Sequence, residues 1–303
     1  MVFGSFNMDI SSRVNRFPEP GETVRGSELL ISPGGKGSNQ AIAAIRAGAN
    51  VSFVTKLGCD LFAKQAMDFF KEENILDDGI FFDENDQTGV ALITVNENSG
   101  ENKITAVVGA CESFTEEEVD VIISRLDQVD ILLLQLETNI EPVEKLLKSA
   151  KQHGILTILN PAPAQEINKE CFKYIDIFTP NETEAQFFTG VQISDEHSIR
   201  QAANILIDKG ISKIVITLGS SGAYARDGLA EKSFDIVDCG PAVDTTGAGD
   251  AFSGGLVAGL AEGLDFFEAI RYGSIVAGLA VTRSGAAMAM PHQYEIEEIL
   301  KKR

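Results

Sequence analysis

The strongest constraint on the fold is an alternation that begins at about residue 51, where short apolar, β-branched runs are each followed by a longer segment with helical periodicity. This alternation is typical of a parallel sheet flanked by helices. The predicted strands are residues 51–57, 131–136, 155–159, 175–179 and 213–218, and the clearest helical segments are residues 60–73 and 141–153. We therefore predict a doubly wound, mostly parallel α/β fold. Since α/β enzymes of this length commonly keep one sheet, residues 1–303 are expected to form a single domain.

Two stretches interrupt the alternation, at residues about 10–33 and about 88–108. In the second stretch, apolar and polar residues alternate from Thr88 to Val95, and the segment 96–102 that follows is rich in turn-forming residues. Neither stretch contains a helical segment, which predicts antiparallel strands outside the main sheet. We expect a small antiparallel β lid. Lids from two subunits are expected to pair into a homodimer, because pairing would cover exposed strand edges.

Composition and charge exclude several classes of partner. Lys and Arg number 25 against 45 Asp and Glu, which gives a net charge of -20 and a field that repels nucleic acids. No basic leader opens the sequence, and no apolar run approaches the roughly 18 residues that a membrane span needs. The four cysteines are scattered, without metal-ligand spacing. These features predict a cytoplasmic protein with reduced thiols.

Polar residues follow several predicted strands at the points where those strands end. They are Glu137, Asn160, Asn181 and Thr217. Near the start, Asn7 and Asp9 follow a predicted strand over residues 2–6 and are suited to hold adjacent hydroxyl groups of a ligand. Taken singly, such a residue is more often part of a turn or a helix cap than of a binding site. Because ligands bind beyond the carboxyl ends of parallel strands, the set together predicts a binding site along one edge of the sheet.

The most informative motif runs from Asp244 to Gly255 and reads DTTGAGDAFSGG. Gly247, Ala248 and Gly249 direct successive backbone amides to the start of a helix, where they bind an anion. Asp250 falls in the first turn of that helix and is placed to accept a proton from an attacking hydroxyl. A purely structural alternative is that Asp250 complements the helix dipole and that the glycines allow tight packing.

Neither of two common phosphate-binding fingerprints fits the sequence. Phe252 stands where a dinucleotide motif needs Gly or Ala. Leu30 stands where a Walker A loop needs glycine, and Gly37 stands where that loop needs Ser or Thr after its lysine. Hydride transfer and P-loop chemistry are therefore not predicted.

A second glycine-rich segment, Gly34–Gln40, precedes a predicted Ala-rich helix over residues 41–47. Lys36 provides a point charge for a phosphate, and Asn39 is both a donor and an acceptor for a hydroxyl group. A solvent-exposed turn is the alternative interpretation of this segment. Glycines at such a density allow a ligand to approach the backbone closely.

Together, the segments Gly34–Gly48 and Asp244–Gly255 resemble the two signatures of the PfkB carbohydrate kinase family, and in particular its ribokinase branch. The similarity extends over essentially the whole chain. The resemblance implies a ribokinase-like fold and ATP-dependent phosphorylation of D-ribose at O5, giving D-ribose 5-phosphate and ADP. Alternatives are a related kinase for 2-deoxyribose, fructose or a nucleoside, or a non-catalytic sugar or nucleotide sensor, which would be expected to have lost the base or the anion hole.

The resemblance also implies roles for individual residues. Asp250 is the base, and the anion hole is Gly247, Ala248 and Gly249. The sugar is held, beside Asp250, by Asn7, Asp9, Gly35, Lys36, Gly37, Ser38, Asn39 and Glu137. ATP is contacted by Asn181, Thr217, Leu218, Gly219, Ser220, Ser221, Gly222, Gly249, Asp250 and Ser274. Mg²⁺ accompanies ATP and is positioned by Glu184 through water. The implied potassium site, for a monovalent activator, is Asp244, Thr246, Ala280, Arg283, Gly285 and Ala289.

Two positions depart from the family pattern. Ala289 stands where ribokinases often carry a serine, which removes one hydroxyl ligand from the implied potassium site. Cys111 stands where many ribokinases carry an asparagine, near the place where the lid is expected to contact the sugar. We therefore expect water or no ligand in place of that hydroxyl at the potassium site, and an effect of Cys111 on sugar preference.

Overall fold

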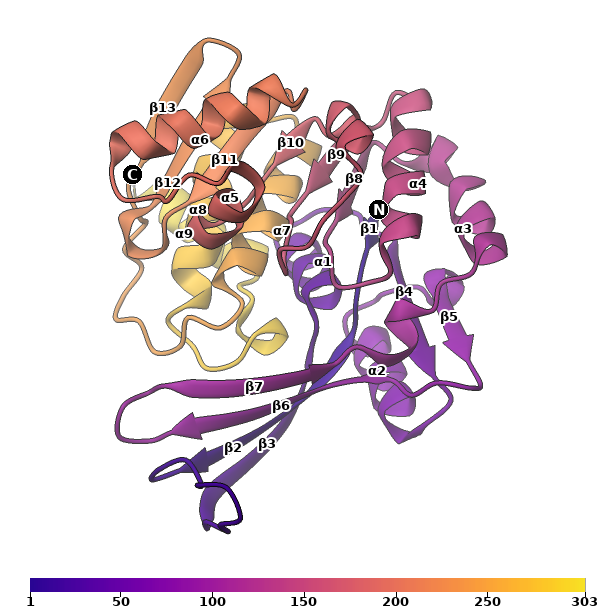
Figure 1. Ribbon diagram of the computed structural model, residues 1–303, viewed down its shortest axis with the longest axis vertical. Helices are drawn as coiled ribbons and strands as arrows, with labels where there is room; N and C mark the ends of the chain where they lie inside the picture. The colour runs from indigo at the N-terminus through magenta and orange to yellow at the C-terminus, as the bar shows by residue number, and fades with distance from the viewer. Residues whose placement is uncertain (303) are drawn as a thin grey trace.

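The computed structural model describes residues 1–302, and its main feature is one large sheet. Within these residues the sheet has nine strands, in the order β13-β12-β11-β10-β9-β8-β1-β4-β5 (Figure 1). The strands are β1 (Val2–Phe3), β4 (Phe53–Gly58), β5 (Ile80–Asp83), β8 (Ile131–Leu134), β9 (Leu156–Leu159), β10 (Ile177–Phe178), β11 (Lys213–Thr217), β12 (Ala223–Asp227) and β13 (Ala230–Phe234). All neighbours from β5 to β11 are parallel, and β12 and β13 add an antiparallel edge. The predicted mostly parallel α/β fold is confirmed.

The large sheet is covered on both faces. In β8, Leu133 belongs to one hydrophobic cluster and Leu134 to another, because successive side chains of a strand point to opposite sides. The first cluster includes residues of α1 (Lys36–Arg46), α2 (Leu61–Glu72), α7 (Ala248–Ala261), α8 (Phe266–Ala280) and α9 (Gln293–Lys301). The second includes residues of α3 (Glu116–Ile123), α4 (Ile140–Gln152), α5 (Glu182–Thr189) and α6 (Glu196–Asp208). Within residues 1–302, no helix combines the length and apolar character that crossing a membrane requires.

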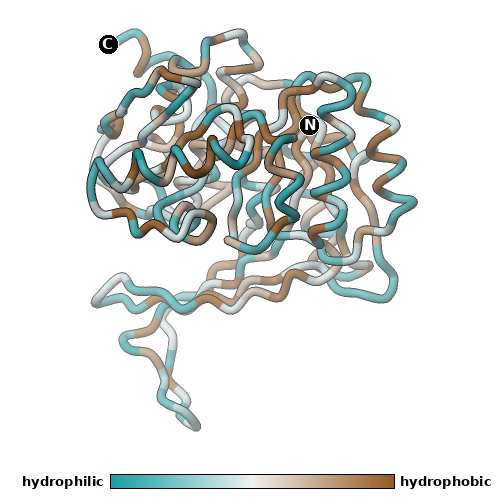
Figure 2. The backbone as a smooth tube through the Cα atoms, turned by 45° about the horizontal axis from the view of Figure 1, so that its top comes forward, coloured by the Kyte–Doolittle hydropathy of each residue, from teal (hydrophilic) through white to brown (hydrophobic). Residues whose placement is uncertain are grey.

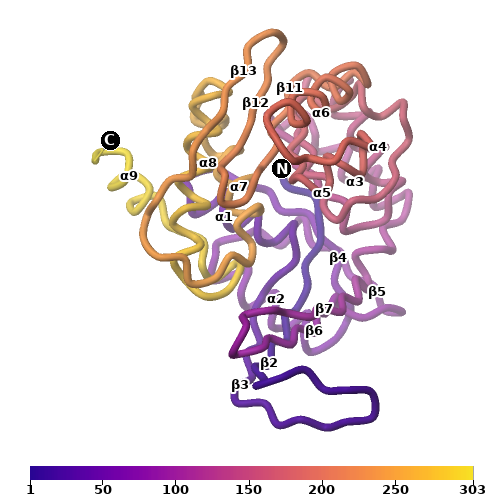
Figure 3. Tube along the Cα trace, turned by 60° about the vertical axis from the view of Figure 1, so that its left-hand side comes forward, coloured from indigo at the N-terminus to yellow at the C-terminus, as the bar shows by residue number. Residues whose placement is uncertain are grey.

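The two excursions form a second, four-stranded sheet, which we call the lid sheet. Its strands, in spatial order, are β3 (Gly26–Gly34), β2 (Asn7–Val14), β6 (Gly89–Asn96) and β7 (Asn102–Val107). The pairs β2–β3 and β6–β7 are antiparallel as predicted, but β2 and β6 are parallel, since both run outward from the body of the protein. The lid sheet also begins earlier than predicted, at Asn7. It projects from one edge of the body, and the β2–β3 connection reaches furthest from it (Figures 1 and 3).

One face of the lid sheet exposes apolar side chains. Ile10 pairs with Ile31 on one side and with Leu92 on the other, so these three side chains share a face. Leu29 lies on the same face, and Leu29, Ile31 and Leu92 are 66%, 48% and 50% exposed. In Figure 2, hydrophobic stretches of the lid strands stand apart from the helices. We call Ile10, Leu29, Ile31 and Leu92 the outer lid face.

The strand order reverses between β1 and β8, which fixes where a ligand can bind. The chain proceeds from β1 toward β4 and β5 on one side, and from β8 toward β11 on the other. Such a reversal opens a crevice at the carboxyl ends of the two central strands. Gly4–Asn7 follow β1 and Gln135–Glu137 follow β8, so both segments reach this crevice.

Candidate active site

The Asp244–Gly255 motif forms the start of α7, as the sequence predicts. Gly247 is the N-cap residue, with a φ of 74° that favours glycine, and no side chain caps this described helix. The amide of Ala248 donates to Thr245 O at 3.2 Å, and a side chain at Gly249 would meet no atom within 4 Å. The first turn of α7 therefore faces open space with the positive end of its dipole, as an anion site requires.

The later glycines of the motif, Gly254 and Gly255, allow close packing of helices. The packing interpretation of the motif therefore applies to these two residues, and the anion-site interpretation applies to its first glycines. A Cβ on Gly254 would lie 2.4 Å from Cβ of Ala43 on α1, and one on Gly255 would lie 2.6 Å from Cγ2 of Val276 on α8. Helix α7 can approach α1 and α8 this closely only because these positions lack a side chain. The close packing brings Asp250 against the start of α1.

Asp250 is 7% exposed and bonds to two amide side chains of α1. Asn39 Nδ2 donates to its Oδ2 at 2.9 Å, and Gln40 Nε2 donates to its Oδ1 at 2.8 Å. Burial raises the pKa of Asp250, against the opposing effects of Lys36 and these two hydrogen bonds. A buried carboxylate with a raised pKa is suited to take a proton from a hydroxyl group.

Helix α1 begins at Lys36, five positions before the predicted start at residue 41, so Lys36–Gln40 lie in its first turns and not in a loop. Gly35 is its N-cap residue, with a φ of 89°, and a Cβ there would lie 2.7 Å from Asn7 N. A Cβ on Gly37 would lie 2.5 Å from the carbonyl carbon of Gly4. The glycines thus let the helix start pack directly on the end of β1.

Glu137, at the end of β8, joins the first turn of α1 to the chain after β1. Its Oε2 accepts hydrogen bonds from Lys36 N at 3.0 Å, from Asn7 Nδ2 at 3.5 Å and from the hydroxyl of Ser5. The predicted residues Asn7, Lys36 and Glu137 are therefore brought together. Ser5 is fully buried and was not among the predicted site residues.

Asp9 lies on β2, on the face opposite the outer lid face, and belongs to the same electrostatic cluster. Its pKa is raised to about 7, first by burial and then by the charges of Glu137 and Asp250. Burial lowers the pKa of Lys36, but Asp250, Glu137, Glu184 and Asp9 outweigh it and leave that pKa raised. One lysine thus faces four carboxylates, and the site carries an excess of negative charge.

Three buried polar atoms near this cluster have no protein partner within the described chain. They are Asn7 Oδ1, Ser38 Oγ and Asn39 Oδ1. Buried polar atoms in folded proteins are nearly always satisfied, so each such atom needs an explanation. All three belong to the set of predicted sugar-binding residues, and a ligand with several hydroxyl groups would supply the missing partners.

A second group of predicted residues gathers at the ends of β10 and β11. Asn181 and Thr217 pair across these strands, and Gly219–Ser221 form a 3₁₀ turn directly after β11. Leu218 and Gly222 flank that turn, and Gly222 has a φ of 86°. The structure therefore places Asn181 beside the Thr217–Gly222 segment. Ser274 lies on α8, where its hydroxyl donates to Ile270 O at 2.9 Å.

Glu184 caps the same region and suits an indirect contact with a cation. Its Oε2 accepts from Asn181 N at 2.8 Å and its Oε1 from Asn181 Nδ2 at 3.0 Å. Burial raises the pKa of Glu184 despite the bond from Asn181 N. Because both oxygens already accept hydrogen bonds from Asn181, Glu184 is suited to contact a cation through water and not directly. In residues 1–302, no group of three or more His, Cys, Asp and Glu side chains is arranged to hold a metal ion.

The residues implied for potassium partly converge beside the start of α7. Asp244 accepts from Thr246 N at 2.9 Å and from Gly285 N at 3.0 Å. Burial alone would raise the pKa of Asp244, but these hydrogen bonds leave it lowered. A Cβ on Gly247 would lie 3.2 Å from Cβ of Ala286, so the loop that follows α8 packs against the predicted anion hole. The guanidinium of Arg283 pairs with Glu295, and Ala289 is buried.

Comparison with known proteins agrees with this geometry. Residues 1–293 match the model of the pfkB family of carbohydrate kinases. A ribokinase of Haemophilus influenzae is 42% identical, with 99% of this chain and 97% of that protein covered. The chain belongs to the pfkB family. A deoxyribokinase of Salmonella typhi is 34% identical, with 99% and 97% covered. The structure of Arabidopsis thaliana ribokinase complexed with ribose and ATP superimposes with a TM-score of 0.91 at 29% identity, covering 99% of this chain and 97% of that one.

Membership in the pfkB family makes the protein a kinase and directs attention to its departures from the family pattern. Cys111 is fully buried, and its Sγ lies 3.1 Å from Lys56 O and accepts from Phe6 N at 3.4 Å. Burial raises the pKa of this thiol. Cys111 therefore supports the backbone that leads into Asn7 and does not line the surface that a ligand would touch.

Sequence reasoning missed two further polar residues of this carbohydrate kinase. Gln40 and Gln135 are both fully buried, and Gln135 Nε2 donates to Gln40 Oε1 at 2.7 Å. Asn160 was predicted, with the other strand-end residues, to belong to a binding site, but no individual role was assigned to it. The available signal was the position of these residues, since Gln40 follows Asn39 in the signature and the other two lie at strand ends.

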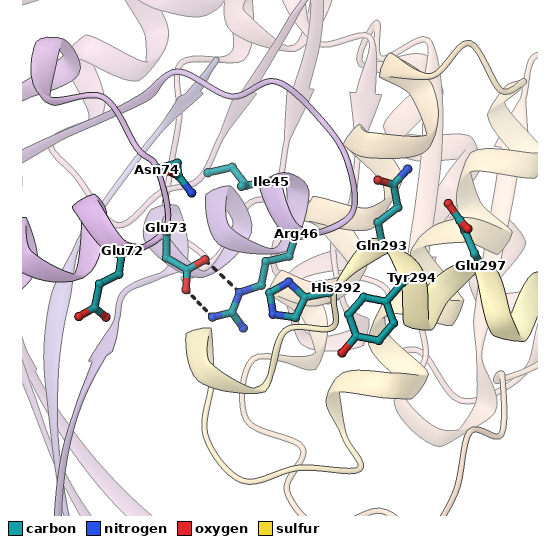
Figure 4. A pocket seen from close by; sticks show the side chains of 9 residues that line it. All are labelled: Ile45, Arg46, Glu72, Glu73, Asn74, His292, Gln293, Tyr294 and Glu297. Carbon is teal, nitrogen blue, oxygen red and sulfur yellow. Dashed lines mark hydrogen bonds and ion pairs between the residues drawn. The ribbon is translucent and has the colours of Figure 1, made fainter.

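A pocket of about 560 Å³ lies away from this kinase site, behind α1 (Figure 4). Arg46 and Glu73 form an ion pair at its wall, and Arg46 Nη1 also donates to Met290 O at 2.9 Å (Figure 4). His292 and Tyr294, at the start of α9, stack in its lining with ring centroids 6.0 Å apart. None of the predicted site residues lines this pocket. The ion pair ties the end of α1 to the end of α2, and the bond to Met290 O ties it to the loop after α8.

Proposed function

We propose that the protein transfers the γ-phosphoryl group of ATP to O5 of D-ribose, giving D-ribose 5-phosphate and ADP. The observation that carries this proposal is the pairing of buried Asp250, at the uncapped start of α7, with Asn39 on α1. A proton acceptor and an anion-binding helix end thereby occupy one place. The ribokinase relatives support the choice of sugar.

In the proposed reaction, Asp250 accepts the proton of the attacking hydroxyl while that oxygen bonds to phosphorus and the bond to the ADP oxygen breaks. The proton then resides on the Asp250 carboxyl. Backbone amides of Gly247 and Gly249, and that of Ala248 once it leaves Thr245 O, stabilise the negative oxygens of the migrating group. Closure of the lid sheet over the sugar keeps water from competing as the acceptor.

The sugar is proposed to bind between the lid sheet and the start of α1. The residues that hold it are Asn7, Asp9, Gly35, Lys36, Gly37, Ser38, Asn39 and Glu137. Their orphaned oxygens, Asn7 Oδ1 and Asn39 Oδ1, would accept sugar hydroxyls, and Lys36 would draw phosphate into a site that is otherwise negative.

ATP is proposed to lie along the ends of β10 and β11. Its contacts are Asn181, Thr217, Leu218, Gly219, Ser220, Ser221, Gly222, Gly249, Asp250 and Ser274. Mg²⁺, when bound with ATP through the water shell of Glu184, would neutralise phosphate charge. Asp244, Thr246, Ala280, Arg283, Gly285 and Ala289 would hold K⁺ next to the anion hole, with Ala289 supplying no side-chain ligand.

We also propose that the single domain and its lid work as a cytoplasmic homodimer. The outer lid face is apolar and exposed, which is costly for a protein that remains a monomer. Pairing of two such faces would bury Leu29, Ile31 and Leu92 in both subunits. Dependence on ATP supports a cytoplasmic site of action.

One assay tests the activity and its main alternative, since the relatives include a deoxyribokinase. ADP release should be measured with D-ribose, 2-deoxy-D-ribose, D-fructose and a nucleoside, each with and without K⁺. The proposal expects the highest kcat/KM with D-ribose and a rise on adding K⁺. A preference of more than about tenfold for 2-deoxyribose would assign the deoxyribokinase activity instead.

A further inference from the structure

The base at the start of α7 is held from behind by a residue that a sugar cannot reach. Gln40 has no exposed surface, yet its Nε2 donates to Asp250 Oδ1 at 2.8 Å. Asn39, by contrast, holds the other oxygen and keeps its own Oδ1 without a protein partner. The two amides therefore differ in what they can bind. Asn39 keeps Oδ1 available for a ligand, whereas both polar atoms of Gln40 are already in hydrogen bonds within the protein.

Gln40 belongs to a chain of buried amides that ends on the backbone. Its Nε2 also donates to Asn160 Oδ1 at 2.9 Å, and Asn160 Nδ2 donates to Thr179 O at 2.9 Å. Its Oε1 accepts from Gln135 Nε2 at 2.7 Å. Every link is between 2.7 and 2.9 Å, which is the normal range for such bonds.

The direction of this chain is dictated by Thr179. A backbone carbonyl can only accept, so Asn160 must turn its nitrogen toward Thr179 and its oxygen toward Gln40. Gln40 must then turn its nitrogen toward Asn160, and the same nitrogen faces Asp250. A flipped Gln40 would place its oxygen against both Asn160 Oδ1 and the carboxylate. The main chain at the end of β10 thereby ensures that the base always faces a donor.

We propose that Gln40 is a positioning residue for the reaction, which fixes the orientation of the Asp250 carboxylate and favours its ionised form, and that Asn160 locks Gln40 in the donating orientation. This inference rests on the proposed role of Asp250 as the base. Gln40 lies behind the carboxylate and adds its hydrogen bond to the effect of Lys36, which also favours the ionised form. Asn39 is left to serve the sugar.

The test is the pH dependence of kcat and kcat/KM in the full-length chain with D-ribose and Mg-ATP. Gln40→Met keeps the length of the side chain but removes its donor. We expect turnover at pH 7 to fall roughly tenfold. The acidic limb of the pH dependence of kcat should move to a pH about one unit higher, because the ionised Asp250 loses one hydrogen bond. KM for the sugar should stay within about twofold, since Gln40 does not reach the cleft.

Two further variants keep the result decisive. Gln40→Glu keeps the shape and places a second carboxyl beside the base, so its acidic limb should move further up than that of Gln40→Met. Thr157→Val is the control, because Thr157 is equally buried and its hydroxyl donates to Tyr174 O without touching Asp250. It should lose stability and keep the wild-type pH profile.

The outcomes separate the two proposals. If Asp250→Asn is inactive and both Gln40 variants keep the wild-type kcat and pH profile, the positioning role is overturned and the role of the base stands. The same conclusion follows if Thr157→Val moves the profile as far as Gln40→Met does. If Asp250→Asn keeps full turnover, the proposed function itself fails.

Discussion

The large sheet and the lid sheet are built from similar strands but are covered differently. In the large sheet, both faces pack against helices, and β8 is fully buried within them. In the lid sheet, the outer lid face has no helix and exposes Leu29, Ile31 and Leu92. The lid sheet is not covered by a helix on the Asp9 face either, since Leu30 and Ile104 on that face are 49% and 57% exposed. Helix α7, which packs on one face of the large sheet, carries the predicted base and anion hole, where small displacements are costly.

The largest expected effect is the loss of turnover on replacing Asp250 at the start of α7. Asp250→Asn should reduce turnover by roughly 10² to 10⁴, the usual worth of a positioned base, without changing the thermal midpoint of unfolding by more than a degree or two. Asp195→Asn, the same change at the N-cap of α6, is the matched control and should keep full activity. Wild-type turnover in Asp250→Asn would refute the assignment of the base.

The next prediction concerns the contribution of the buried Arg46–Glu73 ion pair to the stability of the body. Arg46→Met breaks a buried ion pair, since the Arg46 and Glu73 side chains are 9% and 14% exposed, and it leaves Glu73 without its partner. The free energy of unfolding should fall by about 3 kcal/mol, measured by urea denaturation. Arg200→Met is the control, because its pairs with Glu196 and Glu231 are largely exposed. Its loss should stay below about 1 kcal/mol, and equal losses in both variants would contradict the prediction.

A smaller effect is expected where the two sheets meet. The pKa of Asp9 is raised to about 7 from 3.8, so the folded protein binds an additional proton between these values and loses stability as pH rises through them. Asp9→Asn should therefore stabilise the protein by about 1–3 kcal/mol at pH 8 and by little at pH 4. Thermal unfolding at the two pH values measures the difference. An equal gain at both would show that Asp9 does not titrate as described.

Asp9 also predicts a pH dependence of sugar binding in the wild-type enzyme. The ionised carboxylate is a better acceptor for hydroxyl groups than the protonated form, so KM for the sugar should fall as pH rises from 6 to 8. In Asp9→Asn this dependence should disappear. If KM varies with pH in the same way in both proteins, another group is responsible.

The smallest expected effect on chemistry is at the outer lid face. Ile31→Glu should convert a homodimer into a monomer by light scattering and raise KM for the sugar by a few-fold, because the lid loses its support. Leu229→Glu is the control at a residue that is 97% exposed in the β12–β13 turn of the body. A wild-type protein that is already monomeric at micromolar concentration would contradict the proposed pairing.

The sequence predicts the body well because each buried strand leaves a local pattern. The apolar runs predict β1, β4, β8, β9, β10 and β11, but not β5 or the antiparallel strands β12 and β13, and DTTGAGD predicts the start of α7. It predicts the start of α1 poorly. The run of glycines indicates a loop, whereas packing of Gly35 and Gly37 on the end of β1 makes the helix begin at Lys36. Tertiary contact overrides local propensity at that point.

Pairings over long distances in the sequence account for the remaining differences. The parallel register of β2 and β6 depends on where both strands leave the body, and no local pattern records this. Gln40, Gln135 and Asn160 are unremarkable singly and acquire a role only when three strand and helix ends meet. The burial of Cys111 likewise depends on Phe6 and Lys56, which lie far from it along the chain.

The bond between Asn39 and Asp250 joins residues that are 211 positions apart. During synthesis on the ribosome, the first half of the active site therefore emerges long before the second. A nascent chain that already displays its lid and the start of α1 has no carboxylate with which to activate an acceptor. Catalytic competence thus arises late and all at once, and an incomplete translation product carries no capacity to consume ATP through this site.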